Sequence, residues 1–452
     1  MNALPTSRRL LVGFTLFAMF FGAGNLIFPP WLGGQAGTAA LPAFAGFLVT
    51  AVGFPILGVM AVAESGGLRT LADRVNPSFS RVFTLLIYLS IGPCLAIPRT
   101  ASTSFEMVGR PILEGLGLLE ASAGGFTLLG LTQCVYSILF FGLAWLVALD
   151  PGKLTDRLGR MLCPALLALI AILWAGAALH PLGAPAAPAA GYGAGILSAF
   201  FSGFVAGYQT MDTLAALNFG LIIAMNIRAL GVTTESGVVR ETVFAGAIAS
   251  VIFFVVYGAL VQVGAGAMAL GRFENGAQIL TGAAGELFGS VGMVLLGLVF
   301  FIACFNTCVG LIACCANYFA TILPVLGYRG WAALFAIVSM VVSNAGLTLI
   351  LKLSIPLLIA IYPIAIALIV LALLTLASRA FTRLKLVYPM TILFTGVVSV
   401  TMGVEAFGVR VPGLSDAVAA LPGSALGLAW VAPAVAGALT GVAMSLCVRT
   451  GD

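Results

Sequence analysis

The chain has 452 residues and a formal net charge of +5; 61% of its residues are apolar and only 8% are charged. Because an ordinary soluble domain has about 25% charged residues, this composition excludes soluble enzymes, nucleic-acid-binding domains and secreted disulfide-stabilised proteins. The apolar runs are long and unbroken, which also excludes a membrane β-barrel, since its strands alternate apolar and polar residues. We therefore expect an all-α polytopic protein embedded in membrane lipid, with neither a nucleic-acid partner nor an obligate protein partner.

Twelve apolar segments can be cut from the sequence at its charged and Pro/Gly-rich positions, and each is long enough for a spanning helix, which needs about 20 residues. No small-residue cleavage site follows the first segment, so we expect it to be retained as a span. With the N-terminus placed in the cytoplasm, most Lys and Arg residues fall on the cytoplasmic side, which predicts that both termini are cytoplasmic. The segments are 8–30, 40–63, 79–105, 125–149, 161–179, 193–223, 241–265, 281–322, 331–350, 354–377, 388–407 and 425–447.

Two of these segments contain polar and glycine-rich interruptions near mid-membrane. The first segment holds FFGAGN at 20–25, and each of its glycines weakens a helix by about 1 kcal/mol relative to alanine. The sixth segment holds GYQTMD at 207–212. A carboxylate at the centre of a span costs at least about 2.5–3.5 kcal/mol and usually faces a partner or a water-filled site, so Asp212 is the most unusual residue of the chain.

The two interruptions occupy matching positions. A Pro/Ala-rich loop at 180–192 separates two sets of five segments, and each interruption lies in the first segment of its set. Either one alone is also consistent with a packing kink, because glycine lets helices approach closely. Matching interruptions indicate a transporter site, since an unwound turn exposes amides that suit a carboxylate and carbonyls that suit a small cation. We expect the substrate site to include Gly22, Ala23, Gly24, Asn25, Tyr208, Gln209 and Asp212.

Two further segments carry polar residues with two interpretations each. In the eighth segment, Asn306 is followed by Thr307, which either bonds to the preceding helical turn or supplies an oxygen ligand for a hard cation. In the third segment, Pro98 precedes Arg99. Arg99 either snorkels to the membrane interface or belongs to an outer gate that faces the substrate.

Four stretches together carry a family resemblance: LFAMFFGAGNLIFPP (16–30), IGPCLAIPRTASTSFE (91–106), GYQTMDTLAAL (207–217) and CFNTCVGL (304–311). In motif order, length and number of spans, the chain resembles the branched-chain amino acid:cation symporter family of the BrnQ type, within the amino acid-polyamine-organocation superfamily. The resemblance implies the five-plus-five inverted-repeat fold of the leucine transporter, followed by two extra C-terminal helices. The implied units are a first repeat at 8–179, a second at 193–377 and the additional helices at 388–447.

The resemblance also implies where substrate and ions bind. The backbone amides around Ala23 and Gly24 would hold the substrate carboxylate. The role of Asp212 stays open between a contact to the substrate ammonium, ion coupling and a structural hydrogen bond. Asn306 stands where family members often have a hydroxyl residue. A first sodium site would use the Phe20 carbonyl with Asn25 and Thr210, and a second cation site would use Ala18, Phe21, Ala303, Asn306 and Thr307.

We therefore expect a secondary active transporter, not an enzyme, that imports leucine, isoleucine and valine by sodium symport through alternating access across the bacterial inner membrane. Sodium would be the coupling ion rather than a permanent cofactor. A proton-coupled or other-substrate permease of the same fold is the alternative, and Asp212 is the residue that favours it. A channel is disfavoured because only two asymmetric interruptions are present, and a membrane enzyme because no HExxH, Ser/Lys or Asp/Asp motif is present.

Overall fold

The computed structural model describes residues 4–449 apart from 124–125, 150 and 233. Most of these residues are helical, and two short strands, β1 (Ser122–Ala123) and β2 (Phe126–Thr127), form an antiparallel pair. The α-helices are α1 (Thr6–Phe20), α2 (Ala23–Ala36), α3 (Ala40–Leu48), α4 (Phe54–Ser65), α5 (Leu68–Asp73), α6 (Pro77–Leu89), α7 (Ala96–Gly115), α8 (Leu128–Ala148), α9 (Pro151–Leu179), α10 (Ile196–Ala206), α11 (Asp212–Ala229), α12 (Glu235–Ala267), α13 (Gly276–Ile322), α14 (Gly327–Ser343), α15 (Leu347–Ala377), α16 (Val387–Ala406), α17 (Leu414–Ala419) and α18 (Val431–Arg449).

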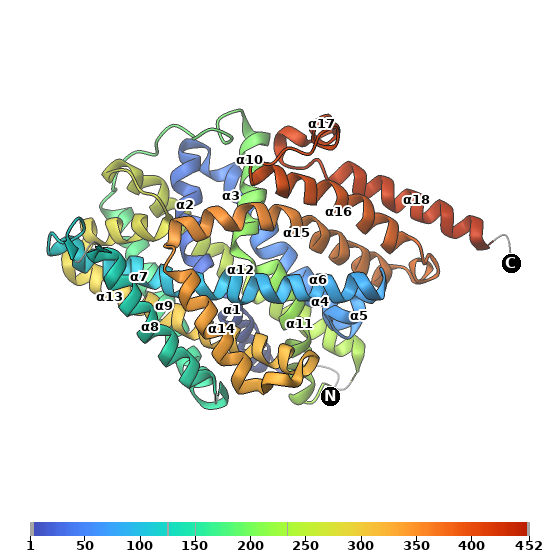
Figure 1. Ribbon diagram of the computed structural model, residues 1–452, viewed down its shortest axis with the longest axis horizontal. Coiled ribbons are helices and arrows are strands. Elements are labelled where there is room, and N and C mark those ends of the chain that lie inside the picture. The colour runs from blue at the N-terminus through green and yellow to red at the C-terminus, as the bar shows by residue number, and fades with distance from the viewer. Residues whose placement is uncertain (1–3, 124–125, 150, 233, 450–452) are drawn as a thin grey trace.

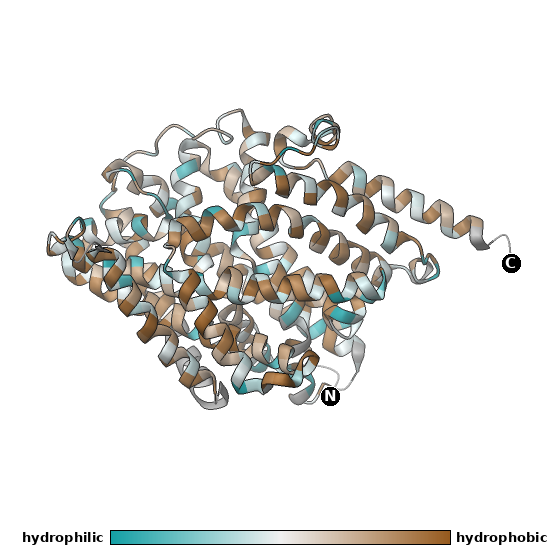
Figure 2. Cartoon of the chain, viewed as in Figure 1, coloured by the Kyte–Doolittle hydropathy of each residue, from teal (hydrophilic) through white to brown (hydrophobic). Residues whose placement is uncertain are grey.

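Within the described residues, eight helical stretches are long and apolar enough to cross a membrane, and two shorter apolar ones lie at Pro164–Leu179 and Val431–Cys447. The first and sixth predicted segments correspond to the interrupted pairs α1–α2 and α10–α11. Each of the twelve predicted segments thus overlaps a helix. Large apolar side chains such as Leu139, Val291 and Leu439 are exposed, as a lipid-facing surface requires, and apolar residues cover most of the helices (Figure 2).

One predicted segment boundary is wrong. The ninth and tenth segments were expected to meet between residues 350 and 354, but α14 ends at Ser343 and α15 begins at Leu347. Gly346, with φ of 86°, turns the chain there, because glycine adopts positive φ without steric cost. Lys352 therefore lies within α15, where its exposed side chain extends from the helix.

Non-α turns bend two of the spans. A π-type turn, η2 (Val49–Gly53), joins α3 to α4, and a second, η3 (Ser90–Cys94), joins α6 to α7. In η3, Gly92 has a ψ of −129° and precedes Pro93, so the helical ladder is broken at that point. This bend sets the direction of the first turn of α7, which carries Arg99. The long helix α13 is also broken, at Gly289 with φ of 62°.

The interrupted helices pack through reciprocal glycine contacts. A Cβ on Gly33 of α2 would overlap the Val261 carbonyl of α12, and one on Gly264 of α12 would overlap the Pro30 carbonyl of α2. In the same way, a Cβ on Gly46 of α3 would overlap the backbone of α10, and one on Gly203 of α10 would overlap the backbone of α3. Such small residues let backbones approach closely in membranes. The same kind of glycine contact thus holds α2, which is the second half of the first broken helix, and α10, which is the first half of the second broken helix.

The C-terminal helices lie at one edge of the molecule. α16 packs against α15, and α18 packs against α16 (Figure 1). This matches the expectation of two helices added after ten. The exact limits of the two repeats stay a prediction.

Candidate functional site

The first interruption is an extended two-residue link. α1 ends at Phe20, Phe21 and Gly22 have extended φ/ψ angles, and α2 begins at Ala23. The last carbonyls of α1 and the first amides of α2 therefore lack the helical partners that a continuous helix would give them. A Cβ on Gly22 would lie 3.1 Å from the Thr307 side chain, so this glycine keeps α13 close to the link.

The second interruption is a tighter turn that ends in a strained residue. α10 passes into the 3-10 turn η4 (Gly207–Thr210), and Met211 follows with φ of 64° and ψ of 9°. Met211 is the only non-glycine residue with positive φ in the described chain, and such a conformation costs of order 1–3 kcal/mol. It places Asp212 in the first turn of α11, where the positive end of the helix dipole favours a carboxylate.

Asn25 joins the two interruptions. Its side-chain nitrogen donates hydrogen bonds to Asp212 Oδ2 at 2.7 Å and to the Tyr257 hydroxyl of α12 at 2.6 Å. All three residues are buried. Because a buried polar group without a partner is costly, this cluster fixes the positions of both breaks relative to α12.

Arg99 lies against the same place from α7. Its Nη1 donates to the Gln209 carbonyl at 2.8 Å, and its guanidinium carbon is 5.2 Å from the centre of the Phe28 ring. A Cβ on Gly24 would lie 2.7 Å from Arg99 Nη2. Arg99 is only 4% exposed, so the interpretation that it snorkels to the interface is wrong, and its charge is held between the two broken helices.

A cavity of about 850 Å³ extends from the two interruptions towards the side of the molecule where α1 begins. On α2 its lining stops at Asn25, whereas on α1 it continues back to Leu11. Apolar residues make up one part of its wall and polar residues of the breaks make up the other. The wall near the breaks includes Gly22, Ala23, Gly24, Asn25, Ile91, Ala96, Arg99, Thr210, Met211, Asp212, Ala215, Asn306, Thr307 and Leu311.

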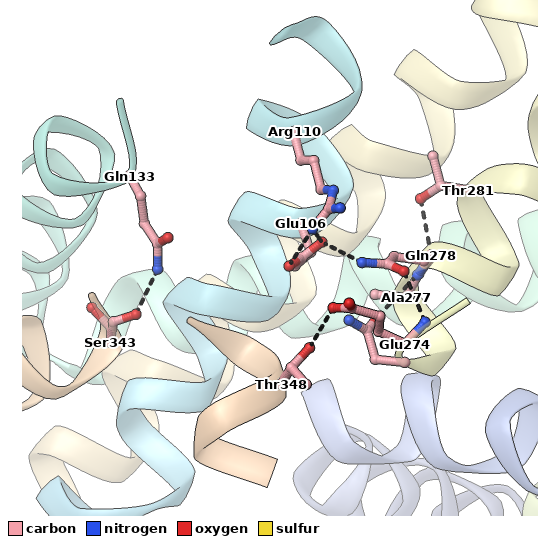
Figure 3. A network of polar contacts seen from close by, with 10 residues as sticks. Glu106, Arg110, Gln133, Glu274, Ala277, Gln278, Thr281, Ser343 and Thr348 are labelled. Carbon is pink, nitrogen blue, oxygen red and sulfur yellow. Dashed lines mark hydrogen bonds and ion pairs between the residues drawn. The ribbon is translucent and has the colours of Figure 1, made fainter. Parts of the chain in front are cut away.

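The opposite side is closed by packing and by a polar network (Figure 3). Glu106 of α7 lies between Arg110, 3.4 Å away, and Gln278 of α13, whose side chain donates to it at 3.3 Å. Glu274 accepts a hydrogen bond from Thr348 of α15 at 3.3 Å. A Cβ on Gly276 would overlap a backbone carbonyl of α2. The start of α13 therefore covers α2 on this side and connects it to α7 and α15.

Not all of the predicted substrate residues line this cavity. Gly22, Ala23, Gly24, Asn25 and Asp212 do. The Tyr208 ring instead stacks on Tyr362 of α15, with centroids 4.5 Å apart, and Gln209 contributes its backbone carbonyl to Arg99. The structure thus brings together all of the substrate residues predicted in the first interruption and, of those predicted in the second, only Asp212.

The predicted ion ligands divide in a similar way. Ala18, Phe20, Asn25, Thr210, Asn306 and Thr307 line the cavity, whereas the Phe21 ring packs on Phe17 and Phe253. The Thr307 hydroxyl donates to the Ala303 carbonyl at 3.0 Å, which is the back-bonded geometry expected of a helical threonine. The Asn306 side-chain oxygen is buried without a hydrogen-bond partner, which fits an oxygen available to a cation.

Sequence reasoning assigned no site role to Tyr257 and left Arg99 between two interpretations. Tyr257 lies in an uninterrupted apolar segment, so no local signal marks it. Arg99 did carry a signal, because an ionisable residue within a span usually faces the interior of the bundle.

The sequence matches known transport proteins over almost its whole length. Residues 6–447 match the model of a family described as branched-chain amino acid transport protein. The chain is 40% identical over 441 residues to the branched-chain amino acid permease BrnQ of Bacillus subtilis, covering 97% of this chain and 96% of that one. It is 38% identical to the branched-chain amino acid transport system 2 carrier protein of Pseudomonas aeruginosa, covering 94% and 93%.

The fold is similar to that of Mhp1, a nucleobase-cation-symport-1 family transporter. A structure of Mhp1 in a closed conformation with bromovinylhydantoin bound has a TM-score of 0.58 at 15% identity, covering 98% of this chain and 93% of that one. The inward-facing conformation of Mhp1 gives a TM-score of 0.55 at 14% identity, covering 97% and 91%. The expected fold of the leucine-transporter type is therefore confirmed.

Proposed function

Because the chain belongs to the branched-chain amino acid transport protein family, we propose that it imports leucine, isoleucine and valine by sodium symport. Its relatives are named permeases and carriers, so it is a multi-pass membrane transporter and not an enzyme. The coupling ion and the direction of transport are the parts of this proposal that need testing.

The observation that carries the proposal is that two interrupted helices face one cavity. The first amides of α2, at Ala23 and Gly24, are suited to a carboxylate, because unpaired amides and the helix dipole favour negative charge. The Phe20 carbonyl, Asn25 and Thr210 lie beside them and offer oxygens to a sodium ion. Sodium bound there would complete a positive pocket for the substrate carboxylate.

A second sodium would bind between the first interruption and α13. The proximity of Gly22 to Thr307 and the unpaired oxygen of Asn306 support this position. Asn306 supplies an amide oxygen in place of a hydroxyl, and amide and carbonyl oxygens suit hard cations.

The apolar wall of the cavity accounts for the substrate class. Ile91, Ala96, Met211, Ala215 and Leu311 surround the polar breaks and would pack on an aliphatic side chain. One methylene more or less in such a pocket changes binding by only about 1–3 kcal/mol, so the three branched-chain substrates should compete strongly.

The asymmetry of the two sides supports alternating access. We propose that the side where α1 begins faces the cytoplasm across the bacterial inner membrane, in line with the distribution of Lys and Arg, which predicts cytoplasmic termini. The cavity then faces inward and the network of Figure 3 closes the outer route. Rocking of the interrupted helices against the others would exchange these states, and each net positive charge moved inward gains about 2.3 kcal/mol per 100 mV.

The test is leucine uptake by proteoliposomes that contain the full chain. A sodium gradient without a pH gradient is expected to drive uptake of labelled leucine, and excess valine should inhibit it more than excess alanine. Uptake that follows a pH gradient and ignores sodium would reject sodium coupling.

The alternative of proton coupling rests on a single observation, the buried position of Asp212 beside the cavity. Its carboxylate is already bonded to Asn25 and approached by Tyr257. A proton taken up at Oδ1 of this carboxylate would remove its negative charge, while Oδ2 could still accept the hydrogen bond from Asn25.

A further inference from the structure

We propose that the Arg99 guanidinium binds the carboxylate of the substrate, together with the first amides of α2. This assignment rests on the proposed function, because it takes an amino acid as the ligand of the cavity. It adds a residue from α7 to a site otherwise built from the two interrupted helices.

The position of the guanidinium supports this assignment. Arg99 lines the cavity, and its Nη2 lies so close to Gly24 that an added Cβ would be 2.7 Å away. The amides of Ala23 and Gly24 belong to the first turn of α2, a helix of 14 residues. An anion placed at this helix start would therefore lie beside both the unpaired amides and the guanidinium.

The charge of Arg99 is not compensated by an ion pair. No described carboxylate lies within salt-bridge distance of it, and its Nε is buried without a hydrogen-bond partner. The guanidinium is held by the Gln209 carbonyl and the Phe28 ring, both neutral. A buried charge without an opposite partner is strongly unfavourable, and an incoming carboxylate would supply that partner through a charge-assisted hydrogen bond.

The neighbouring acid does not replace such a ligand. Within the described residues Asp212 forms no ion pair with Arg99, and its Oδ2 instead accepts the hydrogen bond from Asn25. The cavity thus presents one buried cation and one buried anion on its polar wall. This arrangement is complementary to a zwitterion, and it predicts that a ligand lacking the carboxylate loses the part of the affinity that Arg99 provides.

The test compares leucine with leucinol, in which a hydroxyl group replaces the carboxylate. Each ligand is titrated against the purified full chain in sodium-containing, chloride-free buffer, and the rise in melting temperature gives its affinity. Hydrogen bonds to charged groups contribute about 1.5–3 kcal/mol, so Arg99→Gln should weaken leucine binding about 10- to 100-fold. Leucinol binding should stay nearly unchanged, so the preference for leucine over leucinol should be lost in this variant.

Two further variants separate a binding role from a structural one. Gly24→Ala leaves Arg99 in place but displaces its guanidinium, and it should reduce the preference for leucine over leucinol in the same direction. Arg99→Lys keeps the charge without the planar fork and should restore part of the preference. The matched control is Arg81→Gln, which changes an exposed arginine of the same span whose described side-chain hydrogen bonds go to neighbouring α6 residues, and it should leave the preference unchanged.

The results distinguish this inference from the proposed function. If wild-type protein binds leucine but Arg99→Gln and Gly24→Ala lower leucine and leucinol affinity equally, the proposed function stands and Arg99 is structural. If wild-type protein binds no branched-chain amino acid at all, both are overturned. Should Arg99→Gln not be produced as folded protein, Arg99→Lys gives the answer: a reduced preference for leucine over leucinol, relative to wild type, supports the inference, and an unchanged preference overturns it.

Discussion

The two interrupted helices use different residues at corresponding places in the fold. The first break is an extended, uncharged link that contains Gly22 and presents the ends of two helices. The second is a tight turn that ends in the strained Met211 and presents the carboxylate of Asp212. One break therefore supplies backbone dipoles and the other supplies charge, and Asn25 connects them through a 2.7 Å hydrogen bond.

The largest effect is expected where the second broken helix is held in place. A Cβ on Gly203 would overlap the backbone of Ala43, and neither backbone can move without displacing its helix. Overpacking costs about 1–3 kcal/mol or more, so Gly203→Ala should strongly reduce the yield and melting temperature of monodisperse protein.

Gly142→Ala is the control for this substitution, because a Cβ there meets nothing within 4 Å. It should leave the melting temperature unchanged. Equal stability of the two variants would show that α10 does not depend on close packing with α3. The two broken helices would then not be held in place by the same kind of glycine contact.

The next largest effect is expected from loss of the hydrogen bond by which Asn25 joins the two interruptions. Asn25→Ala removes a donor shared by Asp212 and Tyr257 and leaves a buried carboxylate with fewer partners. Loss of such a bond costs about 1.5–3 kcal/mol, so sodium-dependent leucine uptake should fall about 10- to 100-fold in protein that still inserts. Unchanged uptake with unchanged sodium dependence would remove Asn25 from the site.

A smaller effect is expected at the charged break. Asp212→Asn keeps the shape of the side chain and can still accept the hydrogen bond from Asn25, while it removes the charge at the start of α11. We expect roughly a tenfold loss of uptake, from about 1.4 kcal/mol of lost electrostatic interaction, with sodium dependence retained. The pH profile of uptake is the decisive measurement: a profile that matches wild type supports sodium, whereas its loss in the variant would establish Asp212 as a proton carrier.

The sequence predicted the breaks better than the contacts between them. Glycine, asparagine and aspartate inside apolar runs are local signals, because their cost in a membrane helix does not depend on the rest of the fold. The direction of a side chain does depend on it: the η4 turn directs Tyr208 towards Tyr362, away from the cavity where it was expected. Tyr257 gave no signal, because a tyrosine in an apolar segment becomes functional only through its tertiary neighbours.

The smallest effect tests whether the first break binds an ion independently of the second. Asn306 lies on α13, beside Thr307 and the Gly22 link, and its side-chain oxygen is buried without a partner. Asn306→Ala removes that oxygen and leaves Asn25, Thr210 and the charged break untouched. One neutral ligand contributes about 1 kcal/mol, so the sodium concentration for half-maximal leucine uptake should rise about fivefold.

Gly310→Ala, one helical turn further along the cavity wall, is the matched control, because its Cβ would meet nothing within 4 Å. It should leave the sodium dependence of uptake as in wild type. A rise in Asn306→Ala alone would show that the Asn306 oxygen of α13 takes part in binding the coupling ion beside the first break. If the two variants respond to sodium alike, Asn306 is not a cation ligand, and the second sodium site beside the first break would be wrong.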